Sequence, residues 1–337
     1  MSAQVLIRLD DRSQVGEARR AAADLTRTLS FDSTQAGNVA IAVTEAATNI
    51  LKHATRGKVL LRAIERHGVG GVEVLALDQG PGIPNISASM RDGHSTAGSM
   101  GTGLGALLRS APDLQIYTQP GKGTALFLEY WARELPPHPG SPAIDVGAVC
   151  VPKEGETVSG DAWLFDSSRG PNTLLVADGL GHGPDAARAA RAATAVLAMH
   201  PASDVTELLE LGHGALAPTR GAAVAIARFD FDSGQGKFAG VGNIAARIES
   251  IGNRRQLVSH NGTLGHTVRK IQEFPFELPT DGVIILHSDG LTAHWTLADY
   301  PGLMAKHPAL IAGVLYRDHD RGRDDVTVVA IKNGAGL

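Results

Sequence analysis

The sequence has little of what disulfide-bonded or membrane-spanning proteins need. It holds one cysteine, Cys150, which excludes a disulfide within the chain and is most simply a small buried core residue. No apolar run approaches the roughly 18 residues that span a bilayer, and the N-terminal segment lacks the apolar h-region of a signal peptide. We therefore expect a cytoplasmic protein.

The sequence also lacks a surplus of basic residues, a set of zinc ligands and a P-loop. The 31 Lys and Arg residues are outnumbered by 35 Asp and Glu, which argues against a nucleic-acid binder. There is no close Cys/His set for zinc and no G-x-x-x-x-G-K-[ST] motif. The 337 residues, of which 43% are hydrophobic, suffice for two domains of the usual size, about 100 to 200 residues each.

A polar stripe marks the predicted helix 41–54. Glu45, Asn49 and His53 recur every four positions, so they share one helix face beside an apolar stripe. Glu45 is suited to accept a proton from a hydroxyl, and Asn49 offers an oxygen to Mg²⁺. A solvated polar face, with a packed or capping His53, is the other interpretation of the same spacing.

Glycine motifs follow this helix. Asp78 follows strand-like runs at 58–66 and 71–77 and precedes Gly80 and Gly82. The glycines allow the backbone to turn and leave room for a flat ring. The Asp78 carboxylate can accept a hydrogen bond from an exocyclic amine such as that of adenine. The run 101–105 precedes an apolar helical stretch, as in loops that bind phosphate through backbone N–H groups. Thr124, in a strand-like run at 121–131, adds a hydroxyl. The loop residues are Gly101, Thr102, Gly103, Leu104 and Gly105.

The same glycines match a dinucleotide-binding fingerprint, but their context does not. That fingerprint follows the first strand of a β-α-β unit and leads to a ribose-binding acid about 20 residues on. Here the glycines come late, and the candidate acid, Glu129, lies within an alternating strand.

The order of these motifs resembles the GHKL (Bergerat-fold) ATPases over about residues 4–132, and most closely the RsbT-type serine kinases of bacterial stress modules. The resemblance implies ATP with Mg²⁺, Glu45 as base, Asn49 as Mg²⁺ ligand and Asp78 as adenine reader. It further implies that the run 101–105 is a phosphate loop and that residues 86–100 form a lid over ATP.

A proline-rich linker at 133–142 precedes four separated acidic motifs. Three of them adjoin strand-like runs, so the fold can bring distant carboxylates to one sheet edge. Such a cluster needs cations to offset its charge, and all-oxygen ligands favour Mg²⁺ or Mn²⁺ over zinc. Single Asp-Gly pairs are common turns, but four such motifs in this order are hard to explain as turns. The carboxylates are Asp161, Asp178, Asp289, Asp324 and Asp325.

This order resembles the PP2C-type phosphatases of the SpoIIE and RsbX-like branch over about residues 143–333. The resemblance implies two metal ions, held by the carboxylates and by the carbonyl oxygen of Gly179, with Asp324 and Asp325 as competitors for one position. Leu180 stands where eukaryotic members have a histidine, and His182 is a candidate substitute or a helix-capping residue.

We therefore predict an α/β protein of two domains, a GHKL (Bergerat) α/β sandwich over 1–132 and a PP2C-like α-β-β-α sandwich over 143–335. The resemblances imply a bifunctional protein-serine/threonine kinase and phosphatase that acts on a STAS-domain antagonist in a bacterial partner-switching pathway. The alternative is an anti-sigma-like nucleotide-sensing module fused to an active phosphatase. A sensor histidine kinase core is a weaker alternative, because no helix pair with a phosphoacceptor histidine precedes the ATP motifs.

Overall fold

The computed structural model describes residues 4–54, 56–86, 111, 113–136, 144–168 and 171–334. The chain forms two compact units, of which the first comprises Met1–Ser141 with Ala305–Arg317 and the second comprises Pro142–Met304 with Asp318–Leu337. The first unit thus takes in a segment that the sequence-based division assigns to the second domain. None of the described helices is long and apolar enough to cross a membrane.

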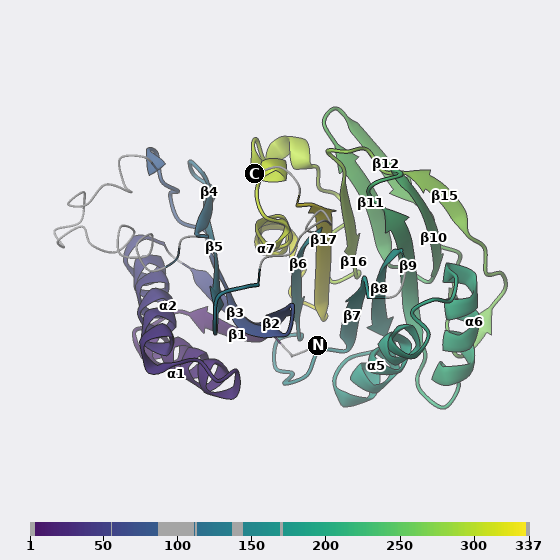
Figure 1. Cartoon of the computed structure of the whole chain (residues 1–337), viewed down its shortest axis with the longest axis horizontal. Helices are drawn as coiled ribbons and strands as arrows, with labels where there is room; N and C mark the ends of the chain where they lie inside the picture. Colours follow the sequence, from purple (N-terminus) through teal and green to yellow (C-terminus); the bar gives the residue numbers. More distant parts are fainter. Residues whose placement is uncertain are drawn as a thin grey trace. The chain divides into compact units, whose positions relative to one another are not determined.

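The first unit is built on a five-stranded antiparallel sheet with the order β1-β2-β3-β5-β4 (Figure 1). The strands are β1 (Val5–Leu9), β2 (Gly57–Arg66), β3 (Val69–Asp78), β4 (Gln115–Gln119) and β5 (Gly123–Trp131). Strands at 58–66 and 71–77 were predicted from their apolar runs, and β2 and β3 confirm them.

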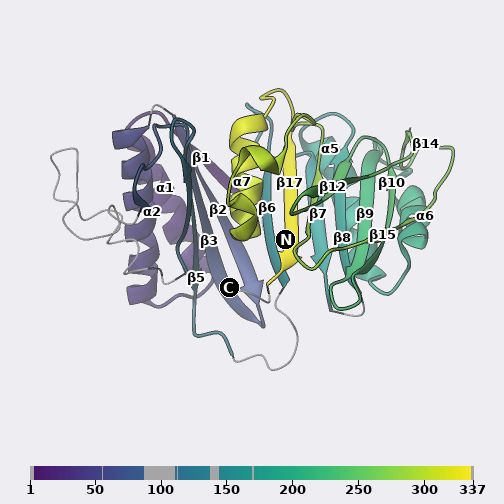
Figure 2. The same ribbon diagram turned by 90° about the horizontal axis from the view of Figure 1, so that it is seen from above.

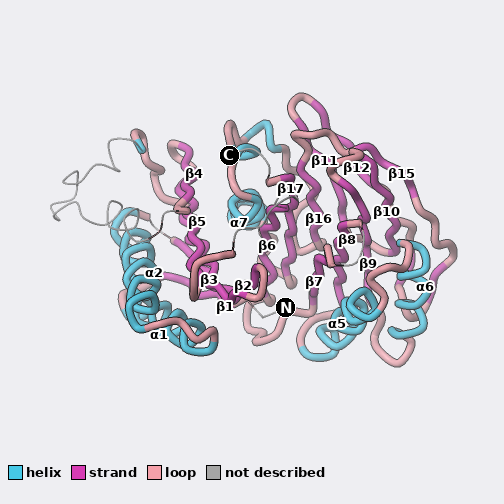
Figure 3. Tube along the Cα trace, in the orientation of Figure 1, coloured by secondary structure: helices cyan, strands magenta, loops and turns pink. Residues whose placement is uncertain are grey.

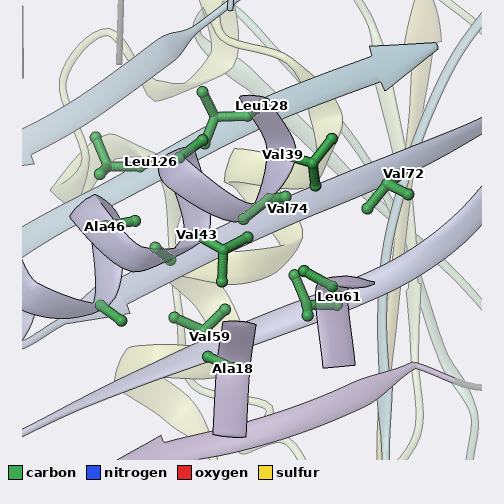
Figure 4. Close-up of a cluster of buried hydrophobic side chains, with 14 of the residues drawn as sticks. Ala18, Val39, Val43, Ala46, Val59, Leu61, Val72, Val74, Leu126 and Leu128 are labelled. Carbon is green, nitrogen blue, oxygen red and sulfur yellow. The ribbon is translucent and has the colours of Figure 1, made fainter. Parts of the chain in front are cut away.

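Helices α1 (Ser13–Thr28) and α2 (Ser33–His53) cover one face of this sheet. The side chain of Asp32 accepts a hydrogen bond from the backbone N–H of Gln35 and so caps the start of α2. The predicted helix at 41–54 is confirmed as the second half of α2. Figure 4 shows Val43 of α2 beside Val74 of the sheet, and both side chains are fully buried.

A third helix, α7 (Pro308–His319), covers the opposite face of the same sheet, as far as Arg317. Figure 2 shows α7 across β3 and β5 from α1 and α2. Along β3 the side chains of 72, 74 and 76 face the helical core of α1 and α2, so Leu75 and Leu77 point to the other side, where Gly313 of α7 packs against them. Strand β3 therefore carries large apolar side chains on both faces because both faces are covered, and its one buried acid, Glu73, is paired with Arg62.

The second unit is a sandwich of two five-stranded antiparallel sheets, with the orders β15-β10-β9-β8-β7 and β12-β11-β16-β17-β6. The strands of the first sheet are β7 (Asp161–Asp166), β8 (Asn172–Gly179), β9 (Ala222–Asp230), β10 (Gln235–Val241) and β15 (Phe274–Glu277). Those of the second are β6 (Ile144–Val151), β11 (Ala245–Ser250), β12 (Asn253–Leu257), β16 (Val283–His287) and β17 (Val326–Asn333). A small ribbon and two short 3₁₀ helices complete the unit, namely β13 (Gly262–Thr263), β14 (Thr267–Val268), η1 (Leu297–Asp299) and η2 (Leu303–Ala305).

The core of the second unit lies between its sheets. Phe238 of β10, Leu286 of β16 and Val329 of β17 belong to one fully buried cluster. Helices α5 (Pro184–Met199) and α6 (Val205–Leu216) pack on the outer face of the β8-containing sheet (Figure 3). The predicted α/β class with two domains of these types is thus confirmed.

Truncating the core of the first unit should destabilise it. Leu128→Ala leaves a cavity at a fully buried position, so we expect a loss of about 2 to 5 kcal/mol in the free energy of unfolding. Urea unfolding measures the loss, with Ile41→Ala as control because Ile41 is 55% exposed. Equal effects of the two changes would contradict this assignment of the core.

Candidate nucleotide site and candidate metal centre

The nucleotide candidate Asp78 ends strand β3, and the backbone holds one of its carboxylate oxygens. Oδ1 accepts from the N–H groups of Gly80, at 2.8 Å, and Thr124, at 3.1 Å. Neither bond uses Oδ2, which leaves that oxygen to accept from a ligand donor. Burial, the largest influence, raises the pKa of Asp78 above its ordinary value, against the lowering effect of the two hydrogen bonds.

The predicted glycines are placed where side chains do not fit. A Cβ on Gly80 would lie 2.9 Å from the carbonyl oxygen of His53, and one on Gly82 would lie 2.5 Å from that of Gln119. Gly82 also has a φ of +74°, in the left-handed region. The backbone at the end of α2 therefore lies close to the turn after Asp78, with no side chain between them. Such a turn leaves room for a flat ring.

Thr118 of β4 is a residue that the sequence reasoning missed. Its Oγ1 accepts from the N–H of Ile83 at 2.8 Å and donates to the carbonyl oxygen of Gly123 at 3.1 Å, so it fastens the glycine turn to the neighbouring strands. Oγ1 also lies 3.2 Å from that of Thr124. No local pattern in the sequence distinguishes Thr118 from other strand threonines.

The remaining nucleotide candidates lie on α2 or outside the described residues. Glu45 and Asn49 are half-buried and His53 is exposed, all on the helix whose end meets Gly80. The phosphate-loop candidates Gly101 to Gly105 and nearly all of the predicted lid fall outside the described residues, so their roles stay predictions.

In the second unit, the acidic candidates stand at strand ends. Asp161 begins β7 and pairs across the ladder with Asp178 near the end of β8. Asp289 follows β16, and Asp324 and Asp325 directly precede β17. Strands β16 and β17 pair with each other. The sandwich thus carries residues that are far apart in the sequence to one edge.

Three of these carboxylates line one cavity of about 370 Å³, namely Asp178, Asp289 and Asp324. Asp325 is not among the described residues that line it, and its Oδ1 accepts from the N–H of Lys153 at 2.8 Å. Asn243, which the sequence reasoning missed, also lines the cavity, and its Nδ2 donates to Oδ2 of Asp289 at 2.7 Å.

These carboxylates are subject to burial and to one another's negative charge. Burial first, and then the charges of Asp161, Asp289 and Asp324, raise the pKa of Asp178 to about 9. Burial and the Asp325 charge raise the pKa of Asp161 to about 7, and burial also raises the pKa of Asp289. These directions are expected for acids grouped without a cation.

The residues present fit a divalent cation. Oδ2 of Asp161, next to Asp178 in the strand ladder, is buried without a hydrogen-bond partner in the described part of the chain. Among the described residues, no three His, Cys, Asp or Glu side chains are grouped closely enough to coordinate one metal ion as they lie. The donor set consists of carboxylate and carbonyl oxygens, which suit hard cations such as Mg²⁺ or Mn²⁺.

The position after Gly179 carries no catalytic histidine. Leu180 lines the cavity and is exposed. His182 is not among the described residues that line the cavity, and its Nδ1 lies 2.6 Å from Oε1 of Glu156. The geometry therefore favours a structural contact for His182 at the start of α5.

Two family models match separate parts of the chain. Residues 8–129 match the histidine kinase-like ATPase domain, which implies ATP for the first unit, and residues 169–333 match the stage II sporulation protein E (SpoIIE) family. The protein is therefore a fusion of an ATPase-type domain with a SpoIIE-family domain, as the motif order predicted.

Individual relatives agree with both halves. Serine/threonine-protein kinase RsbT of Bacillus subtilis (strain 168) is 30% identical over 133 residues, which are 40% of this chain and 100% of RsbT. Phosphoserine phosphatase RsbX of the same organism is 26% identical over 140 residues, 41% of this chain and 70% of RsbX. A solved structure described under "The bacterial stressosome: a modular system that has been adapted to control secondary messenger signaling" has a TM-score of 0.52 and 30% identity, covering 56% of this chain and 100% of its own. The chain belongs to the RsbT family through its first part.

Asp78→Asn should weaken nucleotide binding. The amide oxygen can still accept from Gly80 and Thr124, but an N–H₂ donor replaces Oδ2, so a ligand amine loses a charged acceptor. We expect ADP affinity to fall by about tenfold or more in calorimetric titrations. Asp281→Asn, which changes a carboxylate that accepts from Ile251 in the second unit, is the control. Equal affinities for ADP would contradict the assignment.

Metal binding at pH 7 should release protons. Because the pKa of Asp178 is raised to about 9, the metal-free folded protein keeps a proton there that a bound cation displaces. We expect Mn²⁺ titrations in buffers of different ionisation enthalpy to show this release, and Asp178→Asn to reduce it. Release that is unchanged in Asp178→Asn would contradict the role of this carboxyl.

The same shift sets the pH dependence of the metal-free protein. The folded-state pKa of Asp178 is raised above the ordinary 3.8, so the folded state binds more protons and its stability falls as the pH rises towards 9. In EDTA, we expect the Tm to fall between pH 5 and pH 9, less steeply in Asp178→Asn. An equal slope in both proteins would be the opposing result.

Proposed function

We propose that this chain is a bifunctional protein-serine/threonine kinase and metal-dependent protein-serine/threonine phosphatase. The observation that carries the proposal is that one chain joins a domain similar to RsbT over the whole length of RsbT to a cavity lined by Asp178, Asp289 and Asp324. The similarity to a phosphoserine phosphatase over the second part supports the same conclusion.

In the kinase half, Glu45 accepts the proton of a partner's serine or threonine hydroxyl, and Asn49 supplies an oxygen to the Mg²⁺ of the nucleotide. The two residues share one face of α2, one turn apart, and both are half-buried. Asp78 reads the adenine amine through Oδ2, while Gly80 and Thr124 hold its other oxygen. We propose the run 101–105, which lies outside the described residues, as the phosphate loop.

In the phosphatase half, Asp178, Asp289 and Asp324 hold cations at the cavity. Bound cations lower the pKa of a coordinated water and neutralise charge on the phosphoryl group. Asp324 is the ligand of the neighbouring pair, because Asp325 is engaged by the backbone of Lys153. Asn243 orients Asp289, and Asp161, paired with Asp178 across the ladder, is a further candidate ligand through its buried Oδ2. We propose two ions, Mn²⁺ or Mg²⁺, with the Gly179 carbonyl as a further ligand.

The protein partner is a STAS-domain antagonist or scaffold of a bacterial partner-switching pathway. This step rests on similarity to RsbT, to RsbX and to a structure whose description concerns the bacterial stressosome. A kinase and a phosphatase in one chain would then set the phosphorylation state of one partner, or of related partners.

The two activities can be separated with γ-labelled ATP. We expect purified STAS-domain proteins from the same genome to accumulate more label with Asp178→Ala than with the wild type, because the variant lacks a carboxylate of the metal cavity. The double variant Glu45→Ala/Asp178→Ala is the matched control and should leave the partner unlabelled.

Other outcomes would change the assignment. Absence of label with both proteins, together with nucleotide-dependent partner binding that survives Glu45→Ala, would favour a nucleotide-sensing module fused to a phosphatase. Equal label with the wild type and Asp178→Ala would contradict phosphatase action on that partner.

A further inference from the structure

Helix α7 belongs to the SpoIIE-family segment of the sequence but packs within the first unit. Residues 169–333 match that family, yet Ala305–Arg317 belongs to the compact unit that contains the nucleotide candidates. Every side chain from Pro308 to Arg317 is buried. A helix that is buried all round is held by its surroundings and moves with them.

Several specific contacts seat α7 on the sheet of the first unit. Lys58 donates to the Tyr316 hydroxyl at 2.9 Å and lies 4.0 Å from the centroid of its ring. Just before the helix, the His307 ring stacks on Phe127, with the ring centroids 4.0 Å apart. Gly313 allows close approach, since a Cβ there would lie 2.7 Å from a methyl group of Leu75.

The end of α7 contacts the backbone of the nucleotide candidate itself. Nη1 of Arg317 donates to the carbonyl oxygen of Asp78 at 3.3 Å, and Nε2 of Gln79 donates back to the carbonyl oxygen of Arg317 at 3.2 Å. Arg317 is 7% exposed, so its guanidinium makes this contact away from solvent. These reciprocal bonds fix the strand end from which the Asp78 side chain projects.

Two residues beyond Arg317, α7 ends at His319 and the chain enters the loop of the metal candidates. The N–H of Thr292 donates to the carbonyl oxygen of His319 at 2.9 Å, and that of Arg321 donates to Gly290 at 3.0 Å. This loop is therefore bonded to the residues that follow Asp289, and it continues directly to Asp324. A helix rises only about 1.5 Å per residue, so Arg317 and this loop are separated by less than one turn.

We propose that Arg317 is a positioning residue of the nucleotide site, and that through it α7 couples nucleotide occupancy at Asp78 to the loops that carry Asp289 and Asp324. The inference rests on the proposed function of both sites. A nucleotide that shifts the end of β3 shifts Arg317, and the rigid last turn of α7 carries the change into residues 318–324. By linkage, metal occupancy affects nucleotide affinity by the same factor.

The test uses the full chain in Mg²⁺ buffer, with ADP as the probe. Arg317→Met removes the donor to Asp78, and we expect it to weaken ADP binding about fivefold or more, within the usual range of coupling between sites. Arg317→Lys, which keeps a charged donor, should recover most of the affinity. Tyr316→Phe is the matched control, because it loses a buried bond of α7 to Lys58 and should bind ADP as the wild type does.

Hydrogen–deuterium exchange distinguishes coupling from a purely structural role of Arg317. We expect ADP to change exchange in the wild-type peptides covering 318–324 and 289–292, and this response to be lost in Arg317→Met. If Arg317→Met does not fold, Gln79→Ala tests the same link, since it removes the bond to the Arg317 carbonyl from an exposed side chain. A diminished response in Gln79→Ala supports the proposal.

The opposing outcomes are separable. ADP affinity in Arg317→Met equal to that of the wild type overturns the positioning role. Bound ADP without any change of exchange at 318–324, or an undiminished response in Gln79→Ala, overturns the coupling. Failure of the wild type to bind ADP at all overturns the proposed nucleotide site, and this inference with it.

Discussion

The first unit depends on covering both faces of one antiparallel sheet. Strand β3 buries valine and alanine side chains against α1 and α2, and Leu75 and Leu77 on the other side. Exposing the second face would place large apolar side chains in water, at a cost of about 25 cal/mol per Å² of apolar surface. The chain covers that face with α7, a helix encoded more than 170 residues after the last strand of the sheet. A structural need of the ATPase-type unit is thus met from within the SpoIIE-family segment.

The second unit has a different constraint, which is electrostatic. Its strands bring acidic residues to one edge, and burial with mutual repulsion raises the pKa of Asp178 to about 9 and that of Asp161 to about 7. The repulsion among these carboxylates disfavours folding of the metal-free protein, and cation binding offsets that repulsion. The carboxylates lie at strand ends, where the sandwich core holds the backbone and leaves the side chains to the ligand.

Local patterns were sufficient to predict much of this architecture. The helix at 41–54 and the strands that became β2, β3 and β5 were recognisable because a single spacing of apolar residues defines each of them. The glycines around Asp78 were recognisable because close backbone approach excludes a side chain. Thr118 and Asn243 were missed because each bonds to a residue more than 30 positions away, Ile83 and Asp289 respectively. Helix α7 was missed because an apolar run does not indicate which sheet it will cover.

By itself, the sequence determined the order of the two domain types and the candidate ligands of each, since motif spacing reflects local backbone geometry. Only the tertiary structure decided which candidates share a cavity. Asp324 and Asp325 are neighbours in the chain, yet one lines the cavity and the other accepts from Lys153, because successive side chains point in different directions as a strand begins. The contact of Arg317 with Asp78 likewise joins residues 239 positions apart, which burial of a sheet face brings together and no local pattern encodes.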